Sequence, residues 1–126
     1  MTHTGDIYSG KIVKGFQNGR KFGFPTANVV LDDENKLPDT GVYAVKVTLN
    51  DQPLYGMLYA GTRPTLNLAT LSIEIHLFNF DTDIYGQTLQ FEILRKIRDE
   101  RKFDSPQDLI AQLKKDKEKI LCLLNE

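Results

Sequence analysis

The chain has 126 residues, 40% of them hydrophobic, which is enough for one domain with its own buried core. Its formal net charge is -1, so no overall positive field would attract nucleic acid or an anionic membrane surface. The sequence has no apolar run of about 20 residues and no signal-peptide core, so it predicts a single domain over residues 1–126 that is soluble and cytoplasmic.

Six short runs rich in Val, Ile, Tyr, Phe and Thr follow one another through most of the chain, separated by Gly, Pro, Asn and Asp. The expected strands are Ile7–Val13, Phe22–Val30, Val42–Leu49, Leu54–Ala60, Leu71–Phe80 and Thr88–Leu94. Turns are expected at Asn50-Asp51, Gly61-Thr62-Arg63-Pro64 and Asp81–Gly86. Such short connections favour antiparallel pairing, and six strands in a short chain hide their edges best by closing into a barrel.

A glycine-rich segment, Gly15–Asn28, leads into the second of these runs. Glycines let a backbone approach phosphates closely, and Arg20 and Lys21 would supply compensating charge. The segment is not a P-loop, because no Gly-Lys-Ser/Thr follows at the required spacing. Thr26 and Asn28 are two residues apart on an expected strand, so their oxygens share a face and could bind Mg²⁺ that arrives with a nucleotide. A glycine-rich hairpin without a ligand is the other interpretation.

The fifth run alternates between two faces. Ile73, Ile75 and Leu77 share one face, and Glu74 and His76 share the other, which keeps Glu74 out of the main core. A glutamate held beside a polar ligand could accept the proton of an attacking hydroxyl group. The alternative is an ordinary solvated residue on an exposed strand face.

Positive charges gather after the sixth run. Arg95, Lys96, Arg98, Arg101 and Lys102 precede Phe103, and cations beside an aromatic side chain could bind a phosphate and stack on a flat ring. Asp99 and Glu100 interrupt the cluster, so a solvated loop of mixed charge is the other interpretation.

A helix is expected to begin after Ser105, because a serine N-cap, Pro106 at the first helical position and an acidic third residue are typical of a helix start. One stripe holds most of the apolar residues: Leu109, Ile110, Leu113, Ile120, Leu121 and Leu124. The other side mostly holds Lys114, Lys115, Asp116, Glu118 and Lys119. The helix should pack on the barrel through the apolar stripe, and Cys122 is predicted to be a small core residue.

Together these segments resemble the riboflavin kinase family. The matching motifs, in the order of the family, are Gly10–Gly15, Gly19-Arg20, Gly23–Asn28, Gly41–Ala44, Pro64-Thr65, Glu74–His76, Asp83–Gly86 and Ile97–Ser105. The most diagnostic motif is Pro25-Thr26-Ala27-Asn28. The resemblance implies a mainly β fold, a six-stranded antiparallel Greek-key β-barrel with a C-terminal α-helix. It also implies an enzyme that uses Mg-ATP to phosphorylate the ribityl 5′-hydroxyl of riboflavin, giving FMN and ADP.

The resemblance also assigns roles to single residues. Glu74 is the expected general base, and Thr26 and Asn28 are the expected contacts of Mg²⁺. The expected ATP-binding residues are Gly15, Gly19, Arg20, Lys21, Gly23, Pro25, Thr26, Asn28, Leu77, Asn79 and Tyr85. The expected flavin-binding residues are Arg98, Arg101 and Phe103. Two positions depart from the family, since Arg101 stands where lysine is common and Ile75 where threonine is common.

Many bacterial members of this family carry an N-terminal half that converts FMN to FAD. No His-x-Gly-His motif of that activity occurs here, so the chain is expected to stop at FMN. The expected partners are riboflavin, FMN, ATP, ADP and, in the natural context, a linked FMN adenylyltransferase domain, without nucleic acid or membrane. The alternatives are a flavin-binding module without kinase activity and a small-barrel RNA-binding protein that uses the cluster from Arg95 to Lys102.

Overall fold

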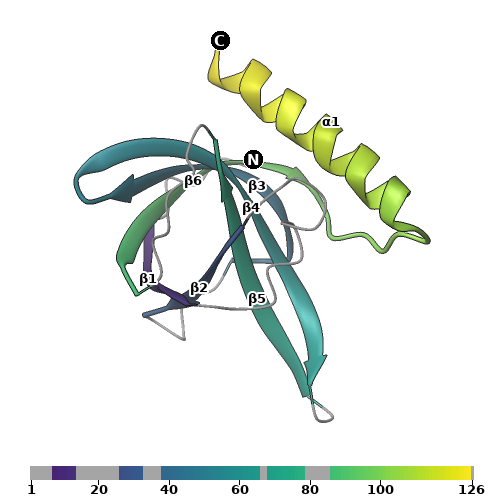
Figure 1. The fold of residues 1–126 in the computed structure, drawn as a ribbon, viewed down its shortest axis with the longest axis horizontal. Coiled ribbons are helices and arrows are strands. Elements are labelled where there is room, and N and C mark those ends of the chain that lie inside the picture. The colour runs from purple at the N-terminus through teal and green to yellow at the C-terminus, as the bar shows by residue number, and fades with distance from the viewer. Residues whose placement is uncertain (1–6, 14–25, 33–37, 66–67, 79–85, 126) are drawn as a thin grey trace.

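The computed structural model describes residues 7–13, 26–32, 38–65, 68–78 and 86–125, with the backbone alone at 62–65 and 68–71. Within these ranges six antiparallel strands close into a barrel in the order β1-β2-β5-β4-β3-β6, and one helix follows them (Figure 1). The elements are β1 (Ile7–Val13), β2 (Ala27–Leu31), β3 (Gly41–Leu49), β4 (Gln52–Thr65), β5 (Leu68–Leu77), β6 (Thr88–Arg98) and α1 (Pro106–Leu124). The predicted fold class is therefore confirmed.

The strand order contains a Greek key. Strands β3, β4 and β5 are consecutive neighbours, and β6 returns to lie beside β3, which gives the spatial order β6-β3-β4-β5. Strand β1 closes the barrel because it pairs with β2 on one side and with β6 on the other. Gly10 lies at this closure, where a Cβ atom would be only 2.5 Å from the carbonyl oxygen of Val30. A residue without a side chain is therefore required where β1 and β2 approach each other.

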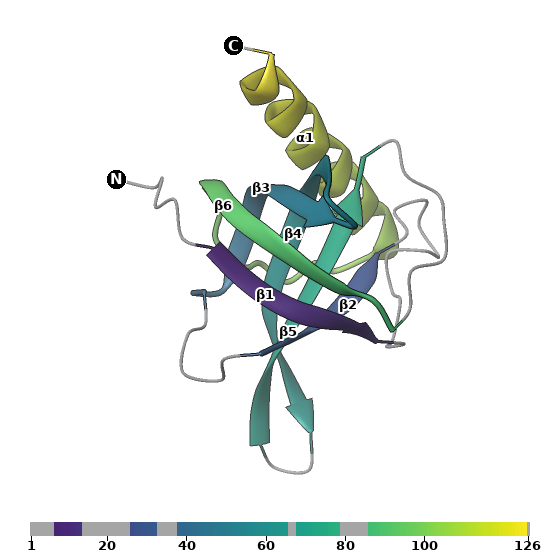
Figure 2. The ribbon, with the colours of Figure 1, turned by 90° about the vertical axis from the view of Figure 1, so that its left-hand side faces the viewer.

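One predicted turn is wrong, and another is confirmed. Residues 61–64 were expected to turn, but β4 continues through them and pairs with β5 as far as Thr65 opposite Leu68. Pairing of β3 with β4 ends at Gly41 opposite Ala60, so the rest of β4 has a neighbour on one side only, where proline is tolerated. This hairpin projects beyond the barrel (Figure 2). The turn predicted at Asn50 and Asp51 has positive φ at both residues, as a tight hairpin requires.

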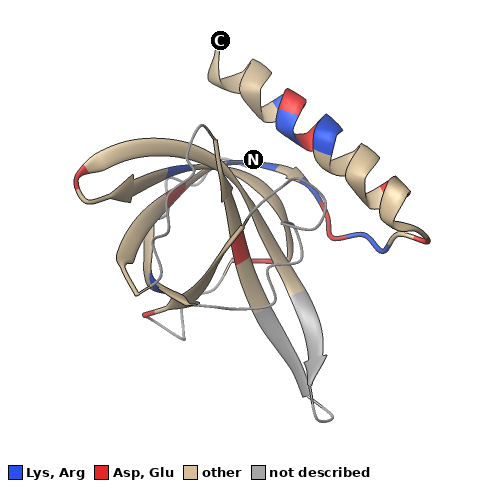
Figure 3. Cartoon of the chain, in the orientation of Figure 1, with Lys and Arg blue, Asp and Glu red and all other residues tan. Residues whose placement is uncertain are grey.

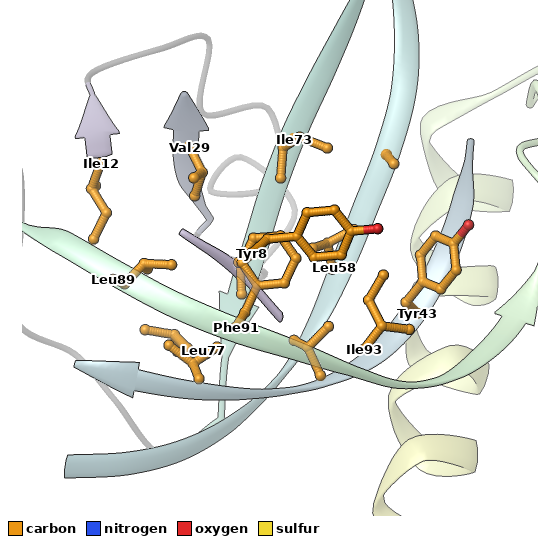
Figure 4. Packing of buried hydrophobic residues seen from close by; sticks show 14 of the residues in the cluster. Tyr8, Ile12, Val29, Tyr43, Leu58, Ile73, Leu77, Leu89, Phe91 and Ile93 are labelled. Atoms are coloured by element: carbon orange, nitrogen blue, oxygen red, sulfur yellow. The ribbon is translucent and has the colours of Figure 1, made fainter. Parts of the chain in front are cut away.

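Apolar side chains form two clusters, one inside the barrel and one on its outer surface. The barrel interior is filled by side chains from all six strands, among which Tyr8 and Phe91 stack with ring centroids 5.1 Å apart (Figure 4). A second cluster, which includes Val42, Met57 and Ile120, lies between the outer surface of the barrel and α1. Strands β3 and β4 are therefore covered on both faces, and part of the outer surface is an interior as well.

The helix begins as predicted, because the Ser105 hydroxyl oxygen accepts a hydrogen bond from the Asp108 amide over 3.1 Å. Three of its side chains lie elsewhere than expected. Asp116 is only 2% exposed, whereas Leu121 is 38% exposed and Cys122 is exposed as well. Asp116 stands three residues after Leu113 and four before Ile120, which places it on the packed side of the helix. No described helix is long and apolar enough to cross a membrane.

Candidate active site

Glu74 lies at the centre of the candidate site, on the outer face of β5. Its neighbours Ile73 and Ile75 point into the barrel core, so the alternation predicted for this strand is confirmed. Although Glu74 faces away from the barrel interior, it is only 7% exposed, and His76 on the same face is equally buried. A buried carboxylate costs folding free energy unless other groups compensate for it. Glu74 is therefore not an ordinary solvated residue on an exposed strand face.

Thr26, which directly precedes β2, and Asn28 of β2 both lie beside Glu74. The hydroxyl group of Thr26 donates a hydrogen bond of 2.8 Å to Oε1 of Glu74. Asn28 is the direct cross-strand partner of Glu74 and is 8% exposed. Among the described residues, nothing accepts a hydrogen bond from Nδ2 of Asn28. The three residues predicted to carry the chemistry are therefore brought together from two strands.

The oxygen atoms of this trio suit a hard cation. A hydroxyl, an amide oxygen and a carboxylate are the kinds of ligand that Mg²⁺ takes, and Thr26 keeps its oxygen lone pairs when it donates its proton to Glu74. Within the described residues, no group of three or more His, Cys, Asp or Glu side chains could hold a metal ion. An ion bound here would therefore depend on other negative groups, such as the phosphates of a nucleotide.

A second part of the site lies where β6 leads into α1. The guanidinium carbon of Arg98 lies 5.7 Å from the ring centroid of Phe103, and that of Arg101 lies 5.2 Å from it. Two of the three residues predicted to bind a flat ring, Arg98 and Arg101, thus both lie beside the ring of the third, Phe103. Phe103 is partly exposed and Arg101 is exposed, so this platform of one aromatic ring and two cations is accessible from outside.

Asp116 holds Arg98 in place, and this pairing was not predicted from the sequence. Nε of Arg98 lies 3.0 and 2.9 Å from the two carboxylate oxygens of Asp116, and Nη2 lies 2.9 Å from Oδ2. Gln112, one turn earlier on α1, donates a hydrogen bond of 2.8 Å to the same carboxylate. The sequence did contain a sign of this pair, because Asp116 lies at the spacing of the apolar stripe. An acidic residue at such a position indicates a buried partner for a cation.

One row of cross-strand pairs joins the two parts. Glu74 of β5 is opposite Tyr59 of β4, Tyr59 is opposite Val42 of β3, and Val42 is opposite Arg98 of β6. Neighbouring strands lie about 4.8 Å apart, so Glu74 and Arg98 are separated by three spacings, or about 14 Å along the surface. Glu74 and Arg98 therefore lie on the same outer face of the sheet, with the fully buried Val42 between Tyr59 and Arg98.

Tyr59 is the second residue that sequence reasoning missed. Its hydroxyl group donates a hydrogen bond of 3.3 Å to Oε2 of Glu100. Burial, followed by the negative charge of Glu100, raises the pKa of Tyr59 to about 12, so the side chain is neutral near pH 7. No motif pointed to Tyr59, and the pairing that places it beside Glu74 is a property of the sheet.

The structure describes few of the other predicted nucleotide-binding residues. Most lie outside the described residues: Gly15, Gly19, Arg20, Lys21, Gly23, Pro25, Asn79 and Tyr85. Leu77 is described, and its side chain packs in the barrel interior rather than on the face of Glu74. The roles of all these residues stay predictions.

Comparison with known proteins gives one family. The family model described as Flavokinase, riboflavin kinase, matches residues 6–124. The chain is 48% identical over 112 residues to the RNA-binding riboflavin kinase RibR of Bacillus subtilis, covering 87% of this chain and 47% of RibR. It is 43% identical over 117 residues to a bifunctional riboflavin kinase/FMN adenylyltransferase of Haemophilus influenzae, covering 92% of this chain and 38% of that protein. The chain thus spans less than half the length of these relatives.

Two crystal structures are similar as well. One is described as a macrolide-efflux protein from Streptococcus pneumoniae, with a TM-score of 0.83 and 40% identity over 89% of this chain and 37% of that one. The other is a riboflavin kinase from Trypanosoma brucei, with a TM-score of 0.66 and 25% identity over 95% of this chain and 80% of that one. The barrel with its C-terminal helix is therefore a fold already seen in a riboflavin kinase of similar length.

Proposed function

The chain belongs to the riboflavin kinase family, and we propose that it transfers the γ-phosphate of ATP to the ribityl 5′-hydroxyl of riboflavin, giving FMN and ADP. The observation that carries this proposal is the convergence of Thr26 and Asn28 on the buried carboxylate of Glu74. Phosphoryl transfer needs a group that accepts the proton of the attacking hydroxyl and groups that hold the phosphates in line with it. The trio supplies both kinds of group at one place on the barrel.

Glu74 acts as the general base in this proposal. Its carboxylate accepts the proton of the 5′-hydroxyl as that oxygen bonds to the γ-phosphorus and the bond to the β-phosphate oxygen breaks, with ADP as the leaving group. The Thr26 hydrogen bond to Oε1 orients the carboxylate that receives the proton. Because phosphoryl transfer requires little covalent chemistry of the protein, most of the acceleration comes from positioning and from neutralised phosphate charge.

Thr26 and Asn28 are the proposed contacts of Mg²⁺, which would supply charge neutralisation to the phosphates of ATP when bound. The side chain of Asn28 is buried beside Glu74, so burial restricts the movement of its amide oxygen. We propose that Gly15, Gly19, Arg20, Lys21, Gly23 and Pro25 cover the nucleotide, with Asn79 and Tyr85 lining its site; the side chain of Leu77 packs in the barrel interior and takes no part in this proposal.

The flavin ring is proposed to bind at the platform of Arg98, Arg101 and Phe103. A flat, electron-poor ring system can stack on Phe103, and the guanidinium groups can bind its carbonyl oxygens or a phosphate. Nε of Arg98 donates to Asp116 and Nη1 donates to the backbone oxygen of Asp99, so few donors of Arg98 are left for a direct contact with the flavin. We therefore assign Arg98 mainly to holding Phe103.

Residues 1–126 are proposed to form the kinase domain alone. In the natural protein an N-terminal FMN adenylyltransferase domain would then be linked to it, as in the bifunctional relatives that are two to three times as long. This domain by itself should stop at FMN. ATP and the unpaired cysteine, Cys122, fit a cytoplasmic location.

RNA binding is the second candidate, because RibR is named as an RNA-binding riboflavin kinase. In this chain two of the five cations of β6 and the following loop are paired with acidic residues, since Lys96 lies 2.7 Å from Asp99 and Arg98 is paired with Asp116. Acidic and basic residues also alternate along α1 and the segment before it (Figure 3). Clustered basic residues favour the binding of RNA phosphates, so charges of both signs interspersed here disfavour the RNA interpretation.

The proposed activity is tested by mixing the purified chain with riboflavin and Mg-ATP and separating riboflavin, FMN and FAD by chromatography with fluorescence detection. FMN should appear only in the complete mixture, with an equal amount of ADP, and FAD should not appear. Persistent riboflavin in a folded protein that still binds flavin would instead support a flavin-binding module without kinase activity.

A further inference from the structure

We propose that Tyr59 and Glu100 bind the hydroxyl groups of the sugar-alcohol chain that links the flavin ring to the phosphorylated oxygen. The inference rests on the proposed function, which places phosphoryl transfer at Glu74 and the flavin ring at Phe103. It adds a specificity determinant to that function, because the site would select ligands with a polyhydroxylated chain.

The first observation is the position of Tyr59. It is the direct cross-strand partner of Glu74, on the side that leads to Val42 and Arg98. With strands about 4.8 Å apart, Tyr59 lies one spacing from Glu74 and two from Arg98. A ligand with its reacting hydroxyl at Glu74 and its ring toward the Phe103 platform would have the neighbouring part of its five-carbon chain beside Tyr59, the cross-strand partner of Glu74 on that side.

The second observation is the chemistry of the pair. Tyr59 donates to Oε2 of Glu100, so the two side chains together offer one phenolic donor and several acceptor sites. Neighbouring hydroxyl groups on a ligand both donate and accept, which matches this set. The bond of 3.3 Å is long, so a ligand hydroxyl can replace either partner at little cost. The raised pKa of Tyr59 keeps the phenol protonated and able to donate.

The third observation is the room left by Gly61. It stands two residues after Tyr59 on β4, on the same face. A Cβ atom at this position would lie 2.4 Å from Cε1 of Tyr59 and 2.8 Å from Oε2 of Glu100. Any side chain here would have to displace both members of the pair. The glycine is thus required for the tyrosine and the carboxylate to meet, and it links them independently of the hydrogen bond.

The test compares two flavins in a Tyr59→Phe variant, which removes one oxygen atom and keeps the ring. Riboflavin carries the polyhydroxylated chain, and lumiflavin carries a methyl group in its place. Binding of each, without ATP, is followed by the change in flavin fluorescence. Loss of one neutral hydrogen bond should raise the Kd for riboflavin about 3- to 10-fold and leave the Kd for lumiflavin unchanged.

Tyr55→Phe is the matched control, because Tyr55 lies on the same strand and the same face but is exposed and outside the proposed site. Both Kd values should be unchanged in that variant. Gly61→Ala should repeat the selective loss of riboflavin affinity, since it displaces the same pair. If Gly61→Ala fails to fold, the Tyr59→Phe comparison still decides the question.

The outcomes separate this inference from the proposed function. Equal weakening of both flavins, or no change in either, would overturn the role of Tyr59 even if FMN is formed. If the unchanged chain binds riboflavin but forms no FMN, the kinase proposal fails, while the comparison of the two flavins still tests Tyr59. A chain that binds no riboflavin overturns both.

Discussion

The hydroxyl group of Thr26 donates a hydrogen bond of 2.8 Å to Oε1 of Glu74, and the two residues lie 48 positions apart in the sequence. The contact links the approach to β2 with the outer face of β5, so it exists only when the barrel has closed. It orients one carboxylate oxygen of Glu74. The geometry of the proposed base therefore depends on a residue that is also a proposed metal contact.

Replacing Thr26 tests this dependence. Thr26→Val keeps the shape of the side chain but removes the donor, so turnover should fall about 10- to 100-fold because the base is no longer held and a metal contact is lost. Thr26→Ser restores the hydroxyl group and should recover most of the activity. Steady-state FMN formation checks both variants. Equal turnover in Thr26→Val and the unchanged chain would show that the hydrogen bond does not serve catalysis.

Replacing Asn28 should affect the metal requirement. In Asn28→Ala the concentration of Mg²⁺ that gives half-maximal FMN formation should rise about 10-fold or more, because one oxygen ligand is missing. Val30→Ala is the control, since Val30 follows on the same face of β2 and is exposed. A Mg²⁺ titration that is identical for the Asn28 variant and this control would remove Asn28 from the metal site.

The buried pair of Asp116 and Arg98 should contribute to stability. Asp116→Asn leaves the Arg98 charge without its counter-charge against α1, which should lower the free energy of unfolding by about 2–4 kcal/mol. Glu118→Gln, on an exposed position of the same helix, should change it by less than about 0.5 kcal/mol. Urea unfolding measures both. Similar values for the two variants would mean that the ion pair does not hold the helix to the barrel.

The pKa of Tyr59 predicts a pH dependence. Burial and Glu100 raise it from 10.0 to about 12, so the folded state holds the phenolic proton more tightly than the unfolded state. The resulting stability is complete below pH 10 and is lost as the pH rises from 10 to 12. Tyr59→Phe lacks this titration, so its free energy of unfolding should fall less between pH 9 and pH 11 than that of the unchanged chain. Parallel pH curves would contradict the shift.

Much of the fold was predictable because it depends on local patterns. The alternation of Ile73 and Ile75 with Glu74 identified the outward carboxylate, and the Ser105-Pro106 pair identified the helix start. Gly61 to Pro64 was predicted wrongly as a turn, since glycine and proline are also found in a hairpin whose outer edges are unpaired. Local sequence does not show how far a strand extends beyond its barrel.

The site was predictable in part for a similar reason. Thr26, Asn28 and Glu74 belong to short motifs, and so do Arg98, Arg101 and Phe103. Tyr59 and Asp116 belong to none, because their importance comes from cross-strand register and from the packing of α1 on β6. Contacts between elements distant in the chain are set by the closed barrel, and a single sequence does not contain them.

Glu74→Gln gives the most direct test of the account. The substitution keeps the shape of the side chain and an oxygen that can accept from Thr26, but it removes the base. FMN formation is measured at saturating riboflavin and Mg-ATP, with Glu118→Gln as the control for the same chemical change at an exposed position. Turnover should fall about 10²- to 10⁴-fold with the KM for ATP largely retained. Turnover equal to that of the control would contradict the role of Glu74 and the site built around it.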